Sequence, residues 1–232
     1  MTVLAICYTM IIPFLPIYLL ELGVPKADVA LWSGLVFGIT FLIAGIMAPI
    51  WGKIADNKGK KRMALRAGFA IAVSYVLIGM VTDQYQLLMG RALVGFANGF
   101  YPAAMTMVSL SVDEKQVGRA LGIFQTGLIL GNVIGPFLGG AVESVVGMRP
   151  VFYISGIAVF IATLAVLFLV KEPKLEVENT TSKEQSKQPA KATSLREDFK
   201  SVQEQPVLVR LLWIYFFMQC VIMMLQPILA LY

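Results

Sequence analysis

Arg91 is a charged residue inside the apolar run 86–110, which makes it a candidate for binding a polar group. An arginine at the centre of a membrane helix costs about 2.5 to 3.5 kcal/mol on insertion scales, so such residues usually bind or move something polar. Asn98 follows seven residues later, on the same helical face. We therefore expect Arg91 and Asn98 to line an aqueous cavity. Snorkelling of Arg91 to the nearer membrane surface is the alternative.

A second group of polar and aromatic residues could contact a small molecule. Gln125 and Asn132 are seven residues apart and should share a helical face. Tyr8, Tyr101 and Trp32 could stack against aromatic or cationic compounds. Each of these residues, taken singly, could instead serve only in helix packing.

The sequence lacks the side-chain combinations that enzymes usually use for catalysis. The sequence has no histidine, and its two cysteines, Cys7 and Cys220, lie in apolar runs. Neither a carboxylate pair nor a cysteine cluster replaces them, so we expect no catalytic residues, no metal site and no cofactor. The sequence predicts that the protein is not an enzyme.

Long apolar segments must position these residues. The chain is 58% hydrophobic and 14% charged, whereas soluble domains carry about 25% charge. A membrane-spanning helix needs about 20 apolar residues. Runs that meet this length occupy roughly residues 2–20, 31–51, 64–82, 86–110, 119–142, 150–170 and 207–231. The pattern predicts an all-α membrane protein: a six-helix transmembrane bundle followed by a seventh helix.

The basic residues predict how the spans are oriented. Lysines and arginines gather in alternate connections, at 53–66, 115–119 and 171–200, whereas the opposite side has only Lys26 and Arg149. Positive residues stay in the cytoplasm, so the N-terminus and the connection between runs six and seven should be cytoplasmic. The net charge of +5 therefore reflects membrane topology, and no nucleic-acid partner is expected.

The chain divides by composition into three parts. We expect a six-helix transmembrane domain over 1–170, a cytoplasmic linker over 171–206, and the first transmembrane helix of a second domain over 207–232. Ser194 and Glu197 form a capping-box pattern, which predicts a short amphipathic helix near 194–203. A solvated linker without that helix is the alternative.

The seventh run resembles the first. At an offset of 211 residues, Ile11, Pro16, Ile17 and Leu20 align with identical residue types at 222, 227, 228 and 231. Duplicated six-helix halves are a known transporter plan, which predicts a parent protein of roughly 400 residues whose C-terminal half is missing here. A natural truncation and a fragment would look the same.

The segment GKIADNKGKKR, residues 52–62, resembles the G-x-x-x-D-R-x-G-R-K loop of the major facilitator superfamily. Asn57 departs from that pattern, where the family usually has a basic residue. The segment RALVG at 91–95 resembles the family's R-x-x-Q-G, with Val94 in place of glutamine. The resemblance implies a gating loop made by Gly52, Asp56, Gly59, Lys60, Lys61 and Arg62. In it Asp56 would latch the cytoplasmic side, either by capping a helix of the missing half or by pairing with a base such as Arg62.

A stripe of glycines marks the fifth run. Glycine at every fourth position makes a smooth groove that lets another helix approach closely. The run also resembles the G-x8-G-x3-G-P-x2-G-G pattern of the superfamily's antiporters, carried here by Gly122, Gly131, Gly135, Pro136, Gly139 and Gly140. The resemblance implies that this groove packs against the other half and closes an outer gate, with a kink at Pro136. Generic helix packing is the alternative.

The resemblance implies a twelve-helix drug:proton antiporter in the plasma membrane. It would export lipophilic or cationic compounds by alternating access, with protons and the missing half as partners. A facilitator or symporter of a sugar or organic acid, and an inactive half-transporter, are the alternatives. All fourteen acidic residues fall at run ends or in connections. Either Arg91 with Asp56 contributes to proton coupling, or the main carboxylate lies in the missing half.

Overall fold

The computed structural model describes residues 1–170, 209–211, 213–218 and 221. Regular structure in these residues is helical throughout, which confirms the predicted all-α class. The chain divides into two units, Met1–Pro173 and Lys174–Tyr232. In the second unit the described residues are helical. The predicted linker, its amphipathic helix and most of the seventh run lie outside the described residues.

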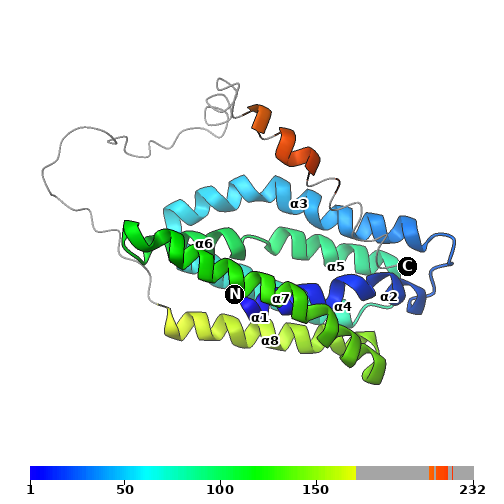
Figure 1. Cartoon of the computed structure of the whole chain (residues 1–232). Coiled ribbons are helices and arrows are strands. Elements are labelled where there is room, and N and C mark those ends of the chain that lie inside the picture. The colour runs from blue at the N-terminus through cyan, green and yellow to red at the C-terminus, as the bar shows by residue number, and fades with distance from the viewer. Residues whose placement is uncertain (171–208, 212, 219–220, 222–232) are drawn as a thin grey trace, which may run out of the picture. The chain divides into compact units, whose positions relative to one another are not determined.

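The first unit contains six segments that are long and apolar enough to span a membrane (Figure 1). We call them spans 1 to 6. They are α1 (Thr2–Ile11) with η1 (Ile12–Phe14) and α2 (Leu15–Glu21); α3 (Val29–Lys58); α4 (Lys60–Gly79); α5 (Gln84–Ala97) with α6 (Phe100–Leu110); η2 (Glu114–Gln116) with α7 (Val117–Val146); and α8 (Met148–Leu169).

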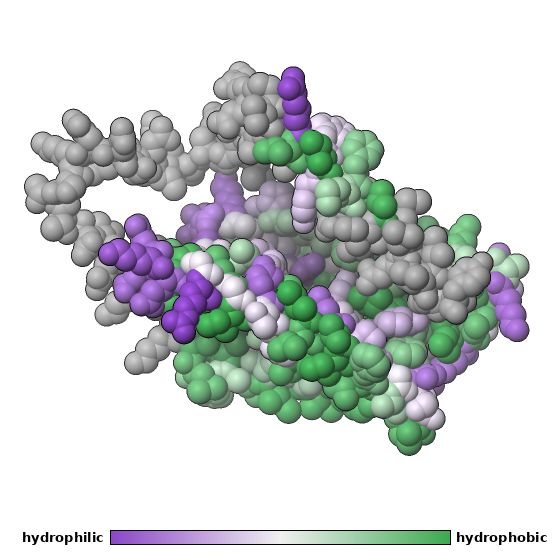
Figure 2. Space-filling view, in the orientation of Figure 1, coloured by the Kyte–Doolittle hydropathy of each residue, from purple (hydrophilic) through white to green (hydrophobic). Residues whose placement is uncertain are grey.

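The flank of the bundle is apolar, as a lipid-facing surface must be. Figure 2 shows hydrophobic side chains over this flank and hydrophilic ones gathered toward the ends. Large apolar side chains such as Phe137 and Phe168 are about four-fifths exposed. In lipid such exposure carries no hydrophobic penalty, because the hydrocarbon tails are as apolar as the side chains.

The segment predicted as a loop over 52–62 is almost entirely helical. α3 ends at Lys58 and α4 begins at Lys60, so Gly59 alone joins them. Its φ of +97° lies in a region that residues with a side chain rarely adopt. A single glycine can therefore reverse the chain between two long helices without a longer loop.

Two spans depart from regular α-helix next to proline: span 1 tightens to a 3-10 turn, and span 4 is interrupted. Proline has no N–H, and its ring clashes with the carbonyl group four residues earlier. In span 1 the 3-10 turn η1 contains Pro13 and precedes Pro16. In span 4 the helix stops at Ala97 and restarts at Phe100, with Pro102 four residues after Asn98. Pro49 and Pro136, by contrast, lie inside continuous helices.

Packing places α1 and α4 at the centre of the unit. α1 packs against α7 and α8, and α4 packs against α5, α6 and α8. Figure 1 shows α7 lying along α1 with α8 beside them. A large buried cluster lies where these helices meet, and it includes Ile11, Leu15, Leu19, Ile78 and Phe152. The Tyr18 hydroxyl donates a hydrogen bond to the Ile78 carbonyl at 3.1 Å and joins span 1 to span 3.

The glycine stripe of the fifth run packs within this unit, which corrects the expected partner. A Cβ on Gly131 would lie 2.7 Å from the Thr2 carbonyl oxygen, and one on Gly135 would lie 2.8 Å from that of Ile6. Gly139 likewise faces α1, at the Met10 carbonyl. The groove that was expected to receive a helix of the other half therefore holds α1 at these three glycines. α1 and α7 belong to the same bundle, and at these glycines their backbones are in direct contact.

Candidate functional site

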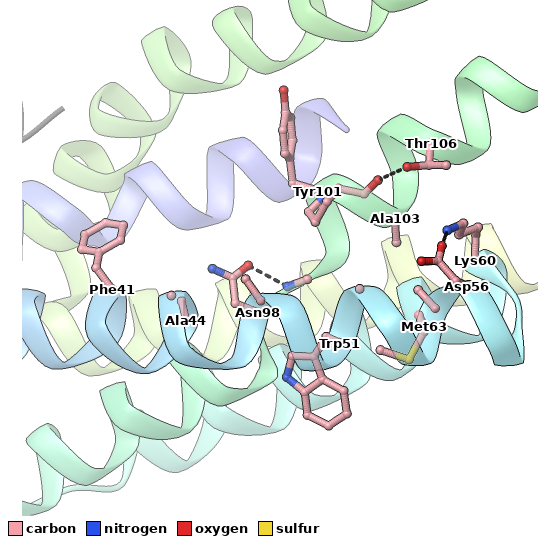
Figure 3. Close-up of a pocket in the computed structure, with 16 residues that line it drawn as sticks. Phe41, Ala44, Trp51, Asp56, Lys60, Met63, Asn98, Tyr101, Ala103 and Thr106 are labelled. Atoms are coloured by element: carbon pink, nitrogen blue, oxygen red, sulfur yellow. Dashed lines mark hydrogen bonds and ion pairs between the residues drawn. The ribbon is translucent and has the colours of Figure 1, made fainter. Parts of the chain in front are cut away.

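A cavity of about 700 Å³ opens between α3, α4 and the start of α6. Its lining is mainly small and aromatic. Figure 3 shows Asn98 and Tyr101 between Phe41 on one side and the Asp56–Lys60 pair on the other. The residues that line it are Phe41, Ala44, Gly45, Ala48, Trp51, Gly52, Ala55, Asp56, Lys60, Met63, Asn98, Gly99, Tyr101, Pro102, Ala103 and Thr106.

A second cavity of about 340 Å³ lies toward α1 and α7. Phe41, Asn98 and Tyr101 line both cavities, so the two spaces share a wall at the interruption of span 4. Three tyrosines and two asparagines supply much of the polar lining of the second cavity. They are Tyr8, Tyr75, Tyr101, Asn98 and Asn132. The structure thus brings together Tyr8 of α1, Tyr101 of α6 and Asn132 of α7 with Asn98 at the interruption of span 4.

Gln125 is connected to the wall of the cavities through a hydrogen bond to Tyr101. Its side-chain amide donates a hydrogen bond of 2.7 Å to the Tyr101 hydroxyl. Because the hydroxyl oxygen accepts that bond, its own hydrogen is left to donate elsewhere. Trp32 lines neither cavity and instead makes an edge-to-face contact with Tyr85, with ring centres 5.1 Å apart.

Arg91 lies behind the wall of the cavities and lines neither of them, contrary to the expectation from its helical face. It is 2% exposed, and in the described residues it is the only buried charged side chain. Its guanidinium lies 5.5 Å from the centre of the Phe37 ring. Tyr8 and Tyr75, which do line the second cavity, lie within reach of its electrostatic field. A side chain this deeply buried does not snorkel to the membrane surface.

The acidic residue of the predicted gating segment lies at the rim of the larger cavity. Asp56 forms an ion pair with Lys60, across the Gly59 turn between α3 and α4. The expected alternative partner, Arg62, is exposed. Lys61 donates a 2.9 Å hydrogen bond to the Leu167 carbonyl at the end of α8. In the cavity linings described here, Asp56 is the one carboxylate.

The interruption of span 4 is bound by two donors that sequence reasoning missed. The Trp51 indole N–H of α3 donates to the Phe96 carbonyl at 2.8 Å. The Arg66 guanidinium of α4 donates to the carbonyls of Ala97 and Asn98 at 3.3 and 3.4 Å. Arg66 was counted with the loop residues, although it falls inside the apolar run 64–82. A charge within a spanning run is the signal that should have marked it.

The whole chain, residues 1–232, matches the Major Facilitator Superfamily. The chain is 38% identical to the Multidrug resistance protein MdtG of Proteus mirabilis (strain HI4320) over 226 residues, which is 97% of this chain and 54% of that protein.

Proteins of the same name in two other organisms are similar over a shorter stretch. Identity is 39% with that of Dickeya zeae (strain Ech586) and 42% with that of Yersinia enterocolitica (serotype O:8 / biotype 1B, strain NCTC 13174 / 8081), over 166 residues each. These alignments cover 71% of this chain and 41% and 40% of the relatives. The chain thus spans about half the length of the curated relatives it matches. Because the family match extends over every residue, the chain belongs to the Major Facilitator Superfamily.

Proposed function

We propose that this chain is the N-terminal half, with the beginning of the second half, of a plasma-membrane exporter of lipophilic drugs driven by proton antiport. The observation that carries the proposal is the pair of cavities that meet at Phe41, Asn98 and Tyr101. Their volumes fall within the range of about 300 to 1,000 Å³ typical of small-molecule sites. The relatives named for multidrug resistance support the class of substrate.

In this proposal alternating access uses the interruption of span 4, which borders both cavities. Transporters often place binding sites at discontinuous helices, at corresponding positions of repeated segments. Span 4 is interrupted before Pro102 and borders both cavities, whereas span 1 only tightens to a 3-10 turn at Pro13. In this proposal the second half completes the cavity, and the two halves rock about it.

Proton coupling would use the positive charge behind the cavity wall. A buried cation favours the ionised form of a carboxyl group brought near it. The acidic residues of the described spans are exposed or only partly buried. We therefore propose that the second half supplies the proton-carrying carboxylate, and that Arg91 adjusts its acidity through the layer formed by Tyr8 and Tyr75.

The Asp56–Lys60 pair fits a latch that forms and breaks during the cycle. Both residues lie at the helix ends that flank Gly59, where positive residues predict the cytoplasmic side. The side chain of Asp56 is 68% exposed, so it is accessible to a helix end of the second half. Such a carboxylate would be attracted to a helix N-terminus.

The test is transport by the full-length protein that contains this chain, in cells stripped of their main exporters. We expect lower accumulation of several lipophilic drugs than in cells with an empty vector, and loss of that difference when a protonophore collapses the proton gradient. The Arg91→Met variant should reach the membrane at normal level yet lose at least about tenfold of the drug-efflux rate, because the buried charge is gone. Uptake of a sugar or organic acid without drug efflux would contradict the proposal.

A further inference from the structure

The interruption of span 4 creates an unusual demand for hydrogen-bond donors. A continuous helix would satisfy the carbonyls of Phe96, Ala97 and Asn98 with N–H groups four residues later. Here Pro102 has no N–H to offer Asn98, and Gly99 adopts a φ of +133°, which separates α5 from α6. A carbonyl at membrane depth that meets neither a donor nor water is costly, so donors from other helices stabilise this interruption.

Trp51 and Arg66 supply those donors as a single unit, which we call the span-4 clamp. Trp51 binds the Phe96 carbonyl, and Arg66 binds those of Ala97 and Asn98. The Arg66 guanidinium carbon also lies 3.5 Å from the centre of the Trp51 ring, a close cation–π contact. The clamp therefore joins α3, α4 and the end of α5, and each member holds the other in place.

The electrostatics of the clamp favour a cation at this point. The C-terminal end of a helix carries about half a negative charge, and the Arg66 guanidinium lies at the end of α5. The Nε of Arg66 is buried without a hydrogen-bond partner among the described residues. The guanidinium therefore makes its hydrogen bonds at the end of α5 through its terminal Nη2 group.

Arg66 lies behind the wall shared by the two cavities, whereas its clamp partner Trp51 lines the larger one. Asn98, whose carbonyl binds Arg66, lines both of them. Its side-chain oxygen accepts from the N–H of Gly99 at 2.8 Å, so the orientation of this side chain depends on the conformation at the interruption (Figure 3). Tyr101, two residues later, also lines both cavities. Whatever fixes the interruption therefore fixes two wall residues at once.

We propose that Arg66, stacked on Trp51, is a positioning residue that holds the interruption of span 4 and thereby sets the shape of the substrate cavity at Asn98 and Tyr101. The inference rests on the proposed function for the meaning of the cavity. Arg66 itself touches no substrate, since it is absent from the lining of both spaces. Its loss should change how tightly a drug binds more than how fast the transporter turns over.

The first experiment examines the clamp without any transport. Hydrogen–deuterium exchange is followed in the full-length protein in nanodiscs, on peptides covering the end of α5 and the start of α6. Arg66→Met should speed exchange there by about tenfold or more, because the last turn of α5 opens more often. Trp51→Phe keeps a smaller aromatic ring under Arg66 but loses the N–H, and should have a smaller effect in the same peptides. Arg119→Met, an exposed arginine near the start of α7, is the matched control and should change nothing there.

The second experiment measures drug efflux in proteoliposomes with a fixed pH gradient. Arg66→Met should raise KM by about fivefold or more with the maximal rate within about twofold, because ground-state binding in the cavity is what changes. Arg66→Lys keeps the charge and should restore part of the affinity. The double variant with Trp51→Phe should lose less affinity than the two single losses combined, since the two side chains contact each other.

Each outcome decides the matter. Accelerated exchange with unchanged KM would make the clamp a purely structural feature and overturn the positioning role. Unchanged exchange in both Arg66→Met and Trp51→Phe would overturn the clamp itself. If the unmodified protein exports no drug, the proposed function is wrong. The hydrogen–deuterium exchange experiment still tests the clamp, because it does not depend on transport. If the Arg66→Met protein does not accumulate in cells, both experiments are done with Arg66→Lys and Trp51→Phe instead.

Discussion

At the scale of single residues, the role of the α7 glycines depends on which helix packs against them. Gly131, Gly135 and Gly139 are buried against α1. Gly122 has no atom of the described residues within 4 Å of an added Cβ, so it faces away from that contact. The side-chain hydroxyl of Thr9 also donates to the Gly131 carbonyl at 3.1 Å, which ties the two backbones together.

This geometry predicts that Gly135→Ala destabilises the bundle. The new Cβ would lie 2.8 Å from the Ile6 carbonyl oxygen, and it would also meet the Thr9 side chain, so α1 must move away. Overpacking of this kind costs about 1 to 3 kcal/mol. The melting temperature of the detergent-solubilised protein should therefore fall.

Gly118→Ala on the same helix is the control, because its Cβ would meet nothing within 4 Å in the described structure. Alanine is the better helix former, so its melting temperature should stay equal or rise slightly. Equal melting temperatures for the two variants would show that α1 does not press against α7 at Gly135.

At the scale of elements, the prolines inside the described spans show why interruptions cannot be assigned from proline alone. α3 continues through Pro49 and α7 through Pro136, whereas span 4 separates between Ala97 and Phe100. The difference in span 4 is the Asn98–Gly99 pair, which supplies an extended residue and a positive φ just before Pro102. The kink at Pro136 stays a prediction.

The positive φ predicts a stability loss for Gly99→Ala. A Cβ there has ordinary contacts, at 3.8 Å from Arg66 and 3.9 Å from Trp51, so the cost arises from the backbone conformation rather than from space. Non-glycine residues in such regions cost about 1 to 3 kcal/mol. Thermal unfolding in detergent should show a lower melting temperature.

Gly38→Ala serves as the comparison for that measurement. Gly38 is an exposed residue inside α3 with open space around it, and alanine should match or exceed the stability of the unmodified protein. If Gly99→Ala behaved like Gly38→Ala, the chain would not hold the conformation that separates α5 from α6.

At the scale of the whole molecule, the distribution of charge predicts how the bundle lies in the membrane. The Lys60–Asp56 pair and the Lys61–Leu167 contact lie at the same end of spans 2, 3 and 6. Basic residues mark this end, and Arg149 lies at the start of span 6, on the opposite side. We propose that the N-terminus and the α3–α4 connection are cytoplasmic.

Reporter fusions test that orientation. Alkaline phosphatase is active only outside the cytoplasm, so a fusion after Lys26 should be active, and fusions after Lys58 or Lys115 should be inactive. Fluorescent-protein fusions at the same positions should give the opposite pattern and control for expression. Activity after Lys58 with none after Lys26 would reverse the topology and place the Asp56–Lys60 pair outside.

The sequence by itself determined the helical class, the six spans of the bundle and the family. These properties are local, because about 20 apolar residues in a row suffice for a span and a motif needs only its spacing. Helical period also made Asn98 and Asn132 candidates for a cavity, and the aromatic ring of Tyr101 made that residue a third.

Only the tertiary structure decided which neighbour each face meets. It placed α1 in the glycine groove, Arg91 behind the cavity wall, and Arg66 on the carbonyls of span 4. Such contacts join residues far apart in the chain, and a helical period fixes a direction around one axis without naming the helix that lies there. In lipid the hydrophobic effect does not favour one helix pairing over another. Close backbone packing and satisfied hydrogen bonds therefore decide which helices pack together.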